Sequence, residues 1–313
     1  IGYGLSALMI PLNIFAGTPL HILYIRFVER FGKGIRTAPR DSLIAGSVRN
    51  GESGKSFGFQ KAMDNSGAII GPLAAFVPLL FLPGNFRIIF LLAGIPAFLA
   101  LFVIIFGIKE AKKNKHELFS RFHFRDFSGR YYFFLVIIFV FTLGNSTDAL
   151  LLVKANELGV ELAFIPLVYL ITNVVSVIMA IPVGILSDRI GKEKVLLVGY
   201  SLYAIVYYGF GVSTSQGAII ALFALYGLYS ATTDGIQKAF ISDMTDKNKK
   251  GTGLGIYNAL IGITLLPASI IAGYLYDNMN SEAPFFFGAI CASMAFMMLL
   301  IFVFSKKEAS APY

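Results

Sequence analysis

A stripe of charged residues runs through a segment that is otherwise apolar enough to cross a membrane. Within positions 19–46, the charges fall at Arg26, Glu29, Arg30, Lys33, Arg36, Arg40 and Asp41. Residues three or four positions apart share one face of a helix. A charge at the centre of a bilayer costs about 2.5–3.5 kcal/mol, so this face must meet a polar interior. The net positive stripe could therefore bind an anion.

Three interpretations of the stripe are open from the sequence. It could be a ladder of internal salt bridges in which Glu29 pairs with Arg26 or Lys33. It could be a binding surface for an anionic or zwitterionic solute, formed by Arg26, Glu29, Arg30, Lys33 and Arg36. Its end could lie in cytosolic water, which we expect for Arg40 and Asp41. The first two interpretations are compatible with each other.

Other ionisable or amide residues also interrupt the apolar segments. They are Lys61, Asp64, Asn145, Asp148, Asp234 and Lys238. Burial can bring a carboxyl group into the physiological titration range, so Asp64, Asp148 and Asp234 are candidate proton carriers. We also expect Asn145, Asp148 and Asp234 to contact the bound solute. Structural ion pairing is the alternative: Asp234 has Lys238 one turn away, whereas Asp148 has no local partner and could reach external water.

The segments that position these residues are apolar and have the length of membrane-spanning helices. The chain is 56% apolar and 14% charged, compared with roughly 25% charged in soluble domains. Ten apolar blocks are about as long as a membrane-spanning helix, and no strand-like alternation is present. They cover 1–16, 19–46, 57–82, 86–108, 131–153, 163–186, 195–213, 217–242, 252–275 and 284–304. The sequence therefore predicts an all-α polytopic membrane protein.

The basic residues predict the orientation of the chain in the membrane. Lys and Arg concentrate in alternate loops, whereas the intervening loops hold only Arg87 and Lys154. By the positive-inside rule, the 109–130 connector and the C-terminus lie in the cytoplasm. The net charge of +8 is then a consequence of topology and lipid contact, and predicts no nucleic-acid partner. We expect a multi-pass protein of the inner, or plasma, membrane.

The chain also repeats itself. Shifted by 197 positions, residues 1–8 fall on 198–205, and Gly54 and Gly58 fall on Gly251 and Gly255 without a gap. Such duplication is typical of transporters built from two pseudo-symmetric helical bundles. The predicted parts are a remnant of the N-terminal bundle (1–108), a cytoplasmic connector (109–130), a six-helix C-terminal bundle (131–305) and a cytoplasmic tail (306–313). By this repeat, about 70 residues, two helices and a loop, are expected before Ile1.

The segment 184–194 carries a recognisable loop motif. Its order is glycine, three residues, Asp-Arg, one residue, glycine and then basic residues, formed here by Gly184, Asp188, Arg189, Gly191 and Lys192. This order resembles the cytoplasmic loop signature of the major facilitator superfamily. The resemblance implies twelve helices in the intact fold, of which family helices 3–6 and 7–12 are present here. It also implies that this loop latches the two halves and controls the conformational switch.

Two further patterns resemble motifs of the same superfamily. Gly58, Gly67, Gly71 and Pro72 are spaced as in the fifth-helix motif of its antiporter branch, although Ala75-Phe76 stands where the family has a glycine pair. This resemblance favours export. Arg26 followed by Gly32 and Gly34 is similar to the fourth-helix pattern, and the longer string RFxxRFGKGIRTAPRD resembles a bacterial and archaeal subgroup.

The resemblance implies a secondary active transporter that moves a small solute by alternating access. With the cationic stripe, it predicts proton-coupled efflux of an anionic or zwitterionic solute, by a monomer in the lipid bilayer. A proton symporter or uniporter for anion uptake is the alternative. A membrane sensor that kept the fold without transport is a more remote one.

Enzymatic and cofactor chemistry has no support in the sequence. The three histidines and Cys291 are scattered, so neither a metal site nor a nucleophile–base pair is expected. The segment 51–56 resembles the end of a phosphate-binding loop, but position 49, where the first glycine is required, is Arg49. We expect a protein that is not an enzyme and binds no cofactor.

Overall fold

The computed structural model describes residues 2–15, 17–49, 51–81, 86–107, 127–145, 148–161 and 164–308. Most of the predicted connector and of the C-terminal tail lies outside these residues. The described residues form helices joined by turns; nine of the ten predicted blocks each correspond to one α-helix, and the block 131–153 corresponds to two. The prediction of an all-α membrane protein is confirmed.

The chain divides into two compact units, each described here by itself. Unit 1 comprises residues 1–43 and 70–123, and unit 2 comprises 44–69 and 124–313. Residues 44–69 therefore pack with the C-terminal part of the chain, although they precede the connector. The predicted division into two repeat-related halves stays a prediction.

Unit 1 contains α1 (Gly2–Leu12), the short 3-10 helix η1 (Asn13–Phe15), most of α2 (Pro19–Ser47), the end of α3 (Ser53–Phe81), and α4 (Phe86–Gly107). Helix α1 packs against α4. It also approaches α2 closely, because a Cβ added to Gly2 would lie 2.7 Å from the carbonyl oxygen of Gly32. Small residues allow such close backbone contact between membrane helices.

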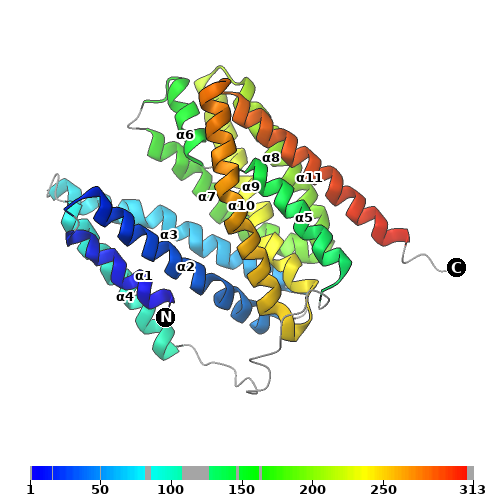
Figure 1. The fold of residues 1–313 in the computed structure, drawn as a ribbon, viewed down its shortest axis with the longest axis horizontal. Coiled ribbons are helices and arrows are strands. Elements are labelled where there is room, and N and C mark those ends of the chain that lie inside the picture. Colours follow the sequence, from blue (N-terminus) through cyan, green and yellow to red (C-terminus); the bar gives the residue numbers. More distant parts are fainter. Residues whose placement is uncertain are drawn as a thin grey trace. The chain divides into compact units, whose positions relative to one another are not determined.

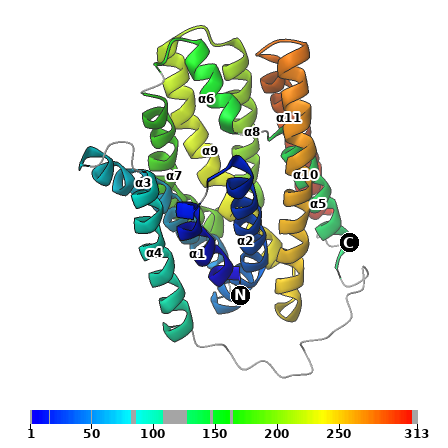
Figure 2. The ribbon, with the colours of Figure 1, turned by 60° about the vertical axis from the view of Figure 1, so that its left-hand side comes forward.

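Unit 2 contains the first part of α3 and the remaining helices (Figure 1). These are α5 (Gly129–Gly144), α6 (Asp148–Glu157), α7 (Ile165–Ile190), α8 (Lys192–Val212), α9 (Gln216–Asp243), η4 (Lys247–Lys249), α10 (Lys250–Asn278) and α11 (Ala283–Glu308). Helix α8 packs against α9 and α11, α5 against α10 and α11, and α7 against α9 (Figure 2). Six segments of the described chain are long and apolar enough to cross a membrane, and all six belong to this unit.

The interior of unit 2 is aromatic, and its outer surface is aliphatic. Tyr131, Tyr200, Tyr203 and Tyr207 are fully buried, and Phe141 stacks on Tyr200 with ring centroids 4.3 Å apart. Large apolar side chains such as that of Ile263 point outward. This distribution suits a lipid environment, where apolar surface is not driven inward and helices associate through packing and polar contacts.

The predicted span 131–153 is not one continuous helix. Helix α5 ends at Gly144, and Asn145 leaves the helical conformation with φ −88° and ψ 80°. Helix α6 begins at Asp148. Glycine and asparagine both have low helix propensity, which accounts for a break at this point.

Candidate functional site

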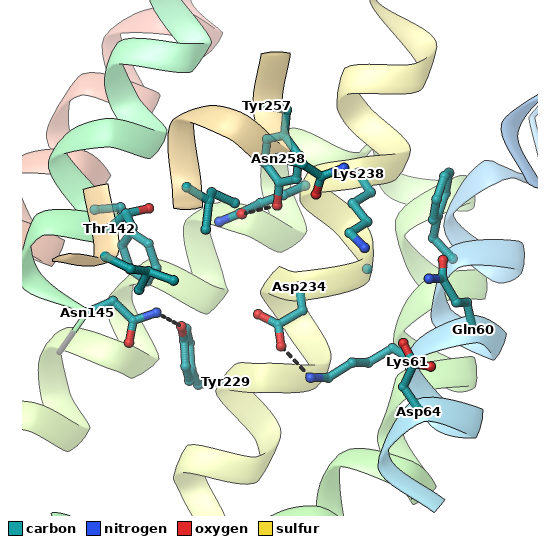
Figure 3. A pocket seen from close by; sticks show the side chains of 16 residues that line it. Gln60, Lys61, Asp64, Thr142, Asn145, Tyr229, Asp234, Lys238, Tyr257 and Asn258 are labelled. Atoms are coloured by element: carbon teal, nitrogen blue, oxygen red, sulfur yellow. Dashed lines mark hydrogen bonds and ion pairs between the residues drawn. The ribbon is translucent and has the colours of Figure 1, made fainter. Parts of the chain in front are cut away.

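A cavity of about 320 Å³ lies within unit 2, among α3, α5, α9 and α10 (Figure 3). Its polar lining consists of Gln60, Lys61, Asp64, Thr142, Asn145, Tyr229, Asp234, Gln237, Lys238, Tyr257 and Asn258. Polar groups inside a membrane bundle are costly unless they face one another or water. This cavity is therefore the candidate functional site.

An ion pair between Lys61 of α3 and Asp234 of α9 lies in this cavity. The Lys61 Nζ and Asp234 Oδ2 atoms are 2.5 Å apart. The Ser230 hydroxyl donates to the same oxygen at 3.0 Å. The side chains of Lys61 and Asp234 are 22% and 43% exposed, so the pair is open to the cavity. We expected Lys238 to be the partner of Asp234, but the ion pair that the structure describes joins two distant parts of the sequence.

Tyrosines and amides surround this ion pair and fix its neighbours. Asn145 Nδ2 donates to the Tyr229 hydroxyl at 3.4 Å. Gln237 is buried between two tyrosines: its Nε2 donates to the Tyr200 hydroxyl at 3.2 Å, and its Oε1 accepts from the Tyr257 hydroxyl at 2.9 Å. Such a satisfied network holds its members in one arrangement. The site therefore has a rigid wall on α8, α9 and α10.

Asp148 lies at the first residue of α6 and is held by two tyrosines. The Tyr226 hydroxyl donates to Oδ1 at 2.7 Å, and the Tyr169 hydroxyl donates to Oδ2 at 3.0 Å. Among the described residues, Asp148 has no partner nearby in the sequence, as expected, but α7 and α9 each supply one. Together with Asn145, it marks the two sides of the break between α5 and α6.

The loop motif contacts the start of α3. Asp188 accepts hydrogen bonds from the backbone N–H groups of Gly54 at 2.9 Å and Lys55 at 2.8 Å, and from Lys192 Nζ at 2.9 Å. Lys192 also lies 2.8 Å from Asp243, which accepts from the Ser53 hydroxyl at 2.8 Å. A carboxylate at a helix N-terminus is stabilised by the unpaired N–H groups and the helix dipole.

The remaining motif residues lie beside this contact. Gly191 adopts φ +101° in the tight turn from α7 to α8, which favours glycine. Arg189 lies in the last turn of α7. The loop therefore joins α7, α8 and α9 to α3 by charged contacts.

Helices α3 and α7 also approach closely through small residues. A Cβ added to Gly184 would lie 2.5 Å from the Gly54 carbonyl oxygen, and one added to Gly58 would lie 2.4 Å from the Ala180 carbonyl oxygen. By contrast, a Cβ added to Gly67 or Gly71 would meet no described atom within 4 Å. Pro72 is exposed in the same helix. Of the four residues of the fifth-helix motif, Gly58 is thus the one in this contact.

The charged stripe of α2 belongs to unit 1. The Arg36 guanidinium lies over the Tyr3 ring, 4.6 Å from its centroid. Arg30 and Lys33 are exposed, and Glu29 is half-buried. The side chain of Arg26 lies outside the described part of the structure.

The end of the stripe differs from our expectation. Asp41 is completely buried, and its Oδ1 lies 3.4 Å from Arg40 Nε. The expectation that Asp41 lies in water is therefore wrong. A buried carboxylate requires a charged or hydrogen-bonding partner, and Arg40 supplies one.

Several residues of the cavity were missed in the sequence. Gln60, Gln237 and Asn258 are polar residues inside apolar blocks, a signal that could have identified them. Tyr229 of the cavity, and Tyr169 and Tyr226 beside Asp148, gave no such signal, because tyrosine is equally common in apolar packing.

Comparison with known families decides the identity of the fold. Residues 1–153 and 133–312 match the family model of the Major Facilitator Superfamily. The chain belongs to this superfamily. An uncharacterized MFS-type transporter of Methanocaldococcus jannaschii is 37% identical over 279 residues, which cover 87% of this chain and 70% of that protein.

A second relative is named for export. The tetracenomycin C resistance and export protein of Streptomyces glaucescens is 28% identical over 46% of this chain and 26% of that protein.

Solved structures share the MFS fold at low sequence identity. The human organic anion transporter MFSD10 (TETRAN) has a TM-score of 0.75 at 14% identity, covering 95% of this chain and 75% of that one. The transporter FucP in its outward conformation has a TM-score of 0.72 at 14% identity, covering 96% and 81%. The predicted superfamily and helical fold are confirmed.

Proposed function

We propose that this superfamily member exports a small anionic or zwitterionic solute in exchange for protons, by alternating access. The observation that carries the proposal is the ion pair between Lys61 and Asp234, which faces a polar cavity among the helices. Charged residues inside a membrane bundle are costly, and they mark solute or ion pathways by default. Asp234 and Lys61 are partly exposed to the cavity, so a solute can reach both.

The proposed proton carriers are carboxylates in or near this cavity. Asp64 and Asp234 line it, and Asp148 follows the helix break at Asn145. Exchange requires that the proton and the solute compete for one group. Asp234 meets this requirement best, because a solute with a cationic group and a proton would each displace Lys61 from its carboxylate.

The charged stripe of α2 is proposed to attract the anionic part of the solute. It provides Arg26, Arg30, Lys33 and Arg36, with Glu29 as an internal counter-charge. Arg30 and Lys33 are exposed, which agrees with an accessible surface. We further propose a monomer in the inner membrane with a cytoplasmic C-terminus, from the distribution of Lys and Arg.

The loop contact supports a switching role for Asp188. Its hydrogen bonds to Gly54 and Lys55 hold the start of α3 to the end of α7. The described contact consists of a few hydrogen bonds and two close approaches of small residues, so solute binding of modest free energy can shift it. We propose that transport breaks and reforms this contact.

Export is favoured over uptake by the fifth-helix motif and by the relative named as an export protein. The test uses inside-out vesicles with an acid interior, reported by a pH-sensitive dye. Adding the small-molecule extract of the expression host should release protons from vesicles with the wild-type protein. Proton-coupled uptake transport would instead let an outwardly directed proton gradient expel preloaded solute, and a sensor would do neither.

Matched variants complete this test. Asp234→Asn should abolish proton release, whereas Glu282→Gln, which alters an ion pair outside the cavity, should retain it. Equal proton release by Asp234→Asn and the wild-type protein would contradict the role proposed for Asp234.

A further inference from the structure

The cavity carries balanced charge. Its lining contains two lysines, Lys61 and Lys238, and two aspartates, Asp64 and Asp234. Helices α3 and α9 each contribute one lysine and one aspartate. A solute with a net charge would disturb this balance unless an ion accompanied it, whereas a solute with both charges would preserve it.

The two oxygens of Asp234 differ in their contacts. Oδ2 accepts from both Lys61 and Ser230. The other carboxylate oxygen points away from Lys61, toward the side of the cavity where Asn145 and Tyr229 lie (Figure 3). Asp234 can therefore accept a further donor from the cavity before its bond to Lys61 breaks.

Lys61 and Asp234 supply each other with a counter-charge in the described structure. A solute anion that bound Lys61 alone would separate this ammonium from the carboxylate of Asp234. A solute cation that bound Asp234 alone would do the same from the other side. A solute that carries both charges replaces both partners of the pair at once, so each side chain keeps a counter-charge.

The rest of the lining suits the carbon part of a small solute. Phe141, Ile261 and Leu265 give the cavity an apolar side on α5 and α10. Its volume of about 320 Å³ lies at the low end for small-molecule sites, so the solute is small.

We propose that the transported solute is a zwitterion whose cationic group binds Asp234 and whose anionic group binds Lys61. The solute thereby replaces the Lys61–Asp234 ion pair on both sides. This inference rests on the proposed transport function and narrows its substrate class: simple anions are excluded as good substrates.

The test is a transport competition in inside-out vesicles that contain the full chain. The probes are two matched sets, phenylalanine with phenylpropanoate and phenylethylamine, and γ-aminobutyrate with butyrate and butylamine, together with the host's small-molecule extract. Compounds that accumulate relative to vesicles without the protein are identified by mass spectrometry and sorted by charge.

Accumulation of zwitterions by the wild-type protein, with their anionic and amine analogues at background, supports the inference. Accumulation chiefly of anions or of amines overturns it while leaving the transport function intact. Accumulation of nothing contradicts the transport function itself, and the inference with it.

Two variants sharpen the result. Their readout is solute binding to the purified full chain, because Asp234→Asn is expected to lose proton-driven transport. Asp234→Asn should raise the affinity for the anion relative to that for the zwitterion by about tenfold or more, and Lys61→Gln should raise the affinity for the amine relative to that for the zwitterion to the same extent. A purely structural ion pair would leave these affinity ratios unchanged, which would overturn the inference. Glu282→Gln should keep the wild-type ratios, and size-exclusion chromatography should verify that each variant is folded.

Discussion

Asp188, near the end of α7, accepts a hydrogen bond from the backbone N–H of Gly54 at the start of α3, with 2.9 Å between Asp188 Oδ1 and Gly54 N. The two residues are far apart in sequence, and the bond joins a loop motif to a helix N-terminus. The helix dipole strengthens it, because the negative carboxylate faces the positive end of α3. This contact is the clearest candidate for a conformational latch in the described structure.

Asp188→Asn tests the latch. The amide removes the negative charge from the helix N-terminus and from Lys192, which should weaken the contact by about 1–2 kcal/mol. The reporter is Ser187→Cys in a Cys291→Ser background, because Ser187 is fully buried beside Gly54. Maleimide labelling of this cysteine should be faster with Asp188→Asn. Unchanged labelling would contradict a latch, and Glu282→Gln, which alters an ion pair outside this loop, serves as the control.

Gly58→Ala tests the close approach of α3 and α7. The added methyl group would lie 2.4 Å from the Ala180 carbonyl oxygen, a backbone atom that cannot move aside alone. Overpacking of this kind costs about 1–3 kcal/mol. The melting temperature in detergent should fall, as should transport. Gly67→Ala, in the same helix and motif, adds its methyl group where no described atom lies within 4 Å, so neither the melting temperature nor transport should fall.

The energetic coupling of Lys61 and Asp234 can be measured with a double-mutant cycle. Lys61→Gln and Asp234→Asn each leave one charge without its partner, whereas the double variant leaves none. Residues in direct contact show interaction energies of about 0.5–3 kcal/mol, so the double variant should be more stable than the sum of the single changes predicts. Additive losses in thermal unfolding would show that the pair is not coupled in the membrane protein.

Tyr226→Phe tests the support of Asp148. The change removes the hydroxyl that donates to Asp148 Oδ1 at 2.7 Å and leaves that oxygen without this donor. Loss of a hydrogen bond to a partly buried carboxylate should destabilise the protein by about 1–3 kcal/mol. Thermal unfolding should show this loss, whereas Tyr208→Phe, at an exposed position on α8, should have little effect. Equal effects would argue against a specific contact.

The ion pair of Lys154 with Glu282 should make stability depend on pH. The hydrogen bond from Lys154 holds the pKa of Glu282 below its ordinary value of 4.5. Because folding lowers this pKa, the stabilisation is present above the ordinary value and is lost as the pH falls through the folded-state pKa. The melting temperature should therefore fall in acid less steeply for Glu282→Gln than for the wild-type protein. Parallel pH curves would show that Glu282 contributes nothing.

Hydropathy and charge in the sequence were enough to predict the helices and some residues of the candidate site. Nine of the ten apolar blocks correspond to one α-helix each, and the block 131–153 divides into α5 and α6. This agreement is expected because the length needed to cross the bilayer and the internal hydrogen bonds of a helix are local properties. Asp64, Asn145 and Asp234 were identified as functional candidates for a similar reason: a polar residue in an apolar block is visible without any knowledge of its neighbours.

The partners of those residues were decided only by the tertiary structure. From the sequence we expected Lys238 as a partner of Asp234, no local partner for Asp148, and water around Asp41. The fold adds Lys61 as a partner of Asp234, brings two distant tyrosines to Asp148, and buries Asp41. Spacing along one helix shows which residues share a face, but packing between helices determines which face meets which. Residues brought together from α3, α7 and α9 therefore become partners only when those helices pack.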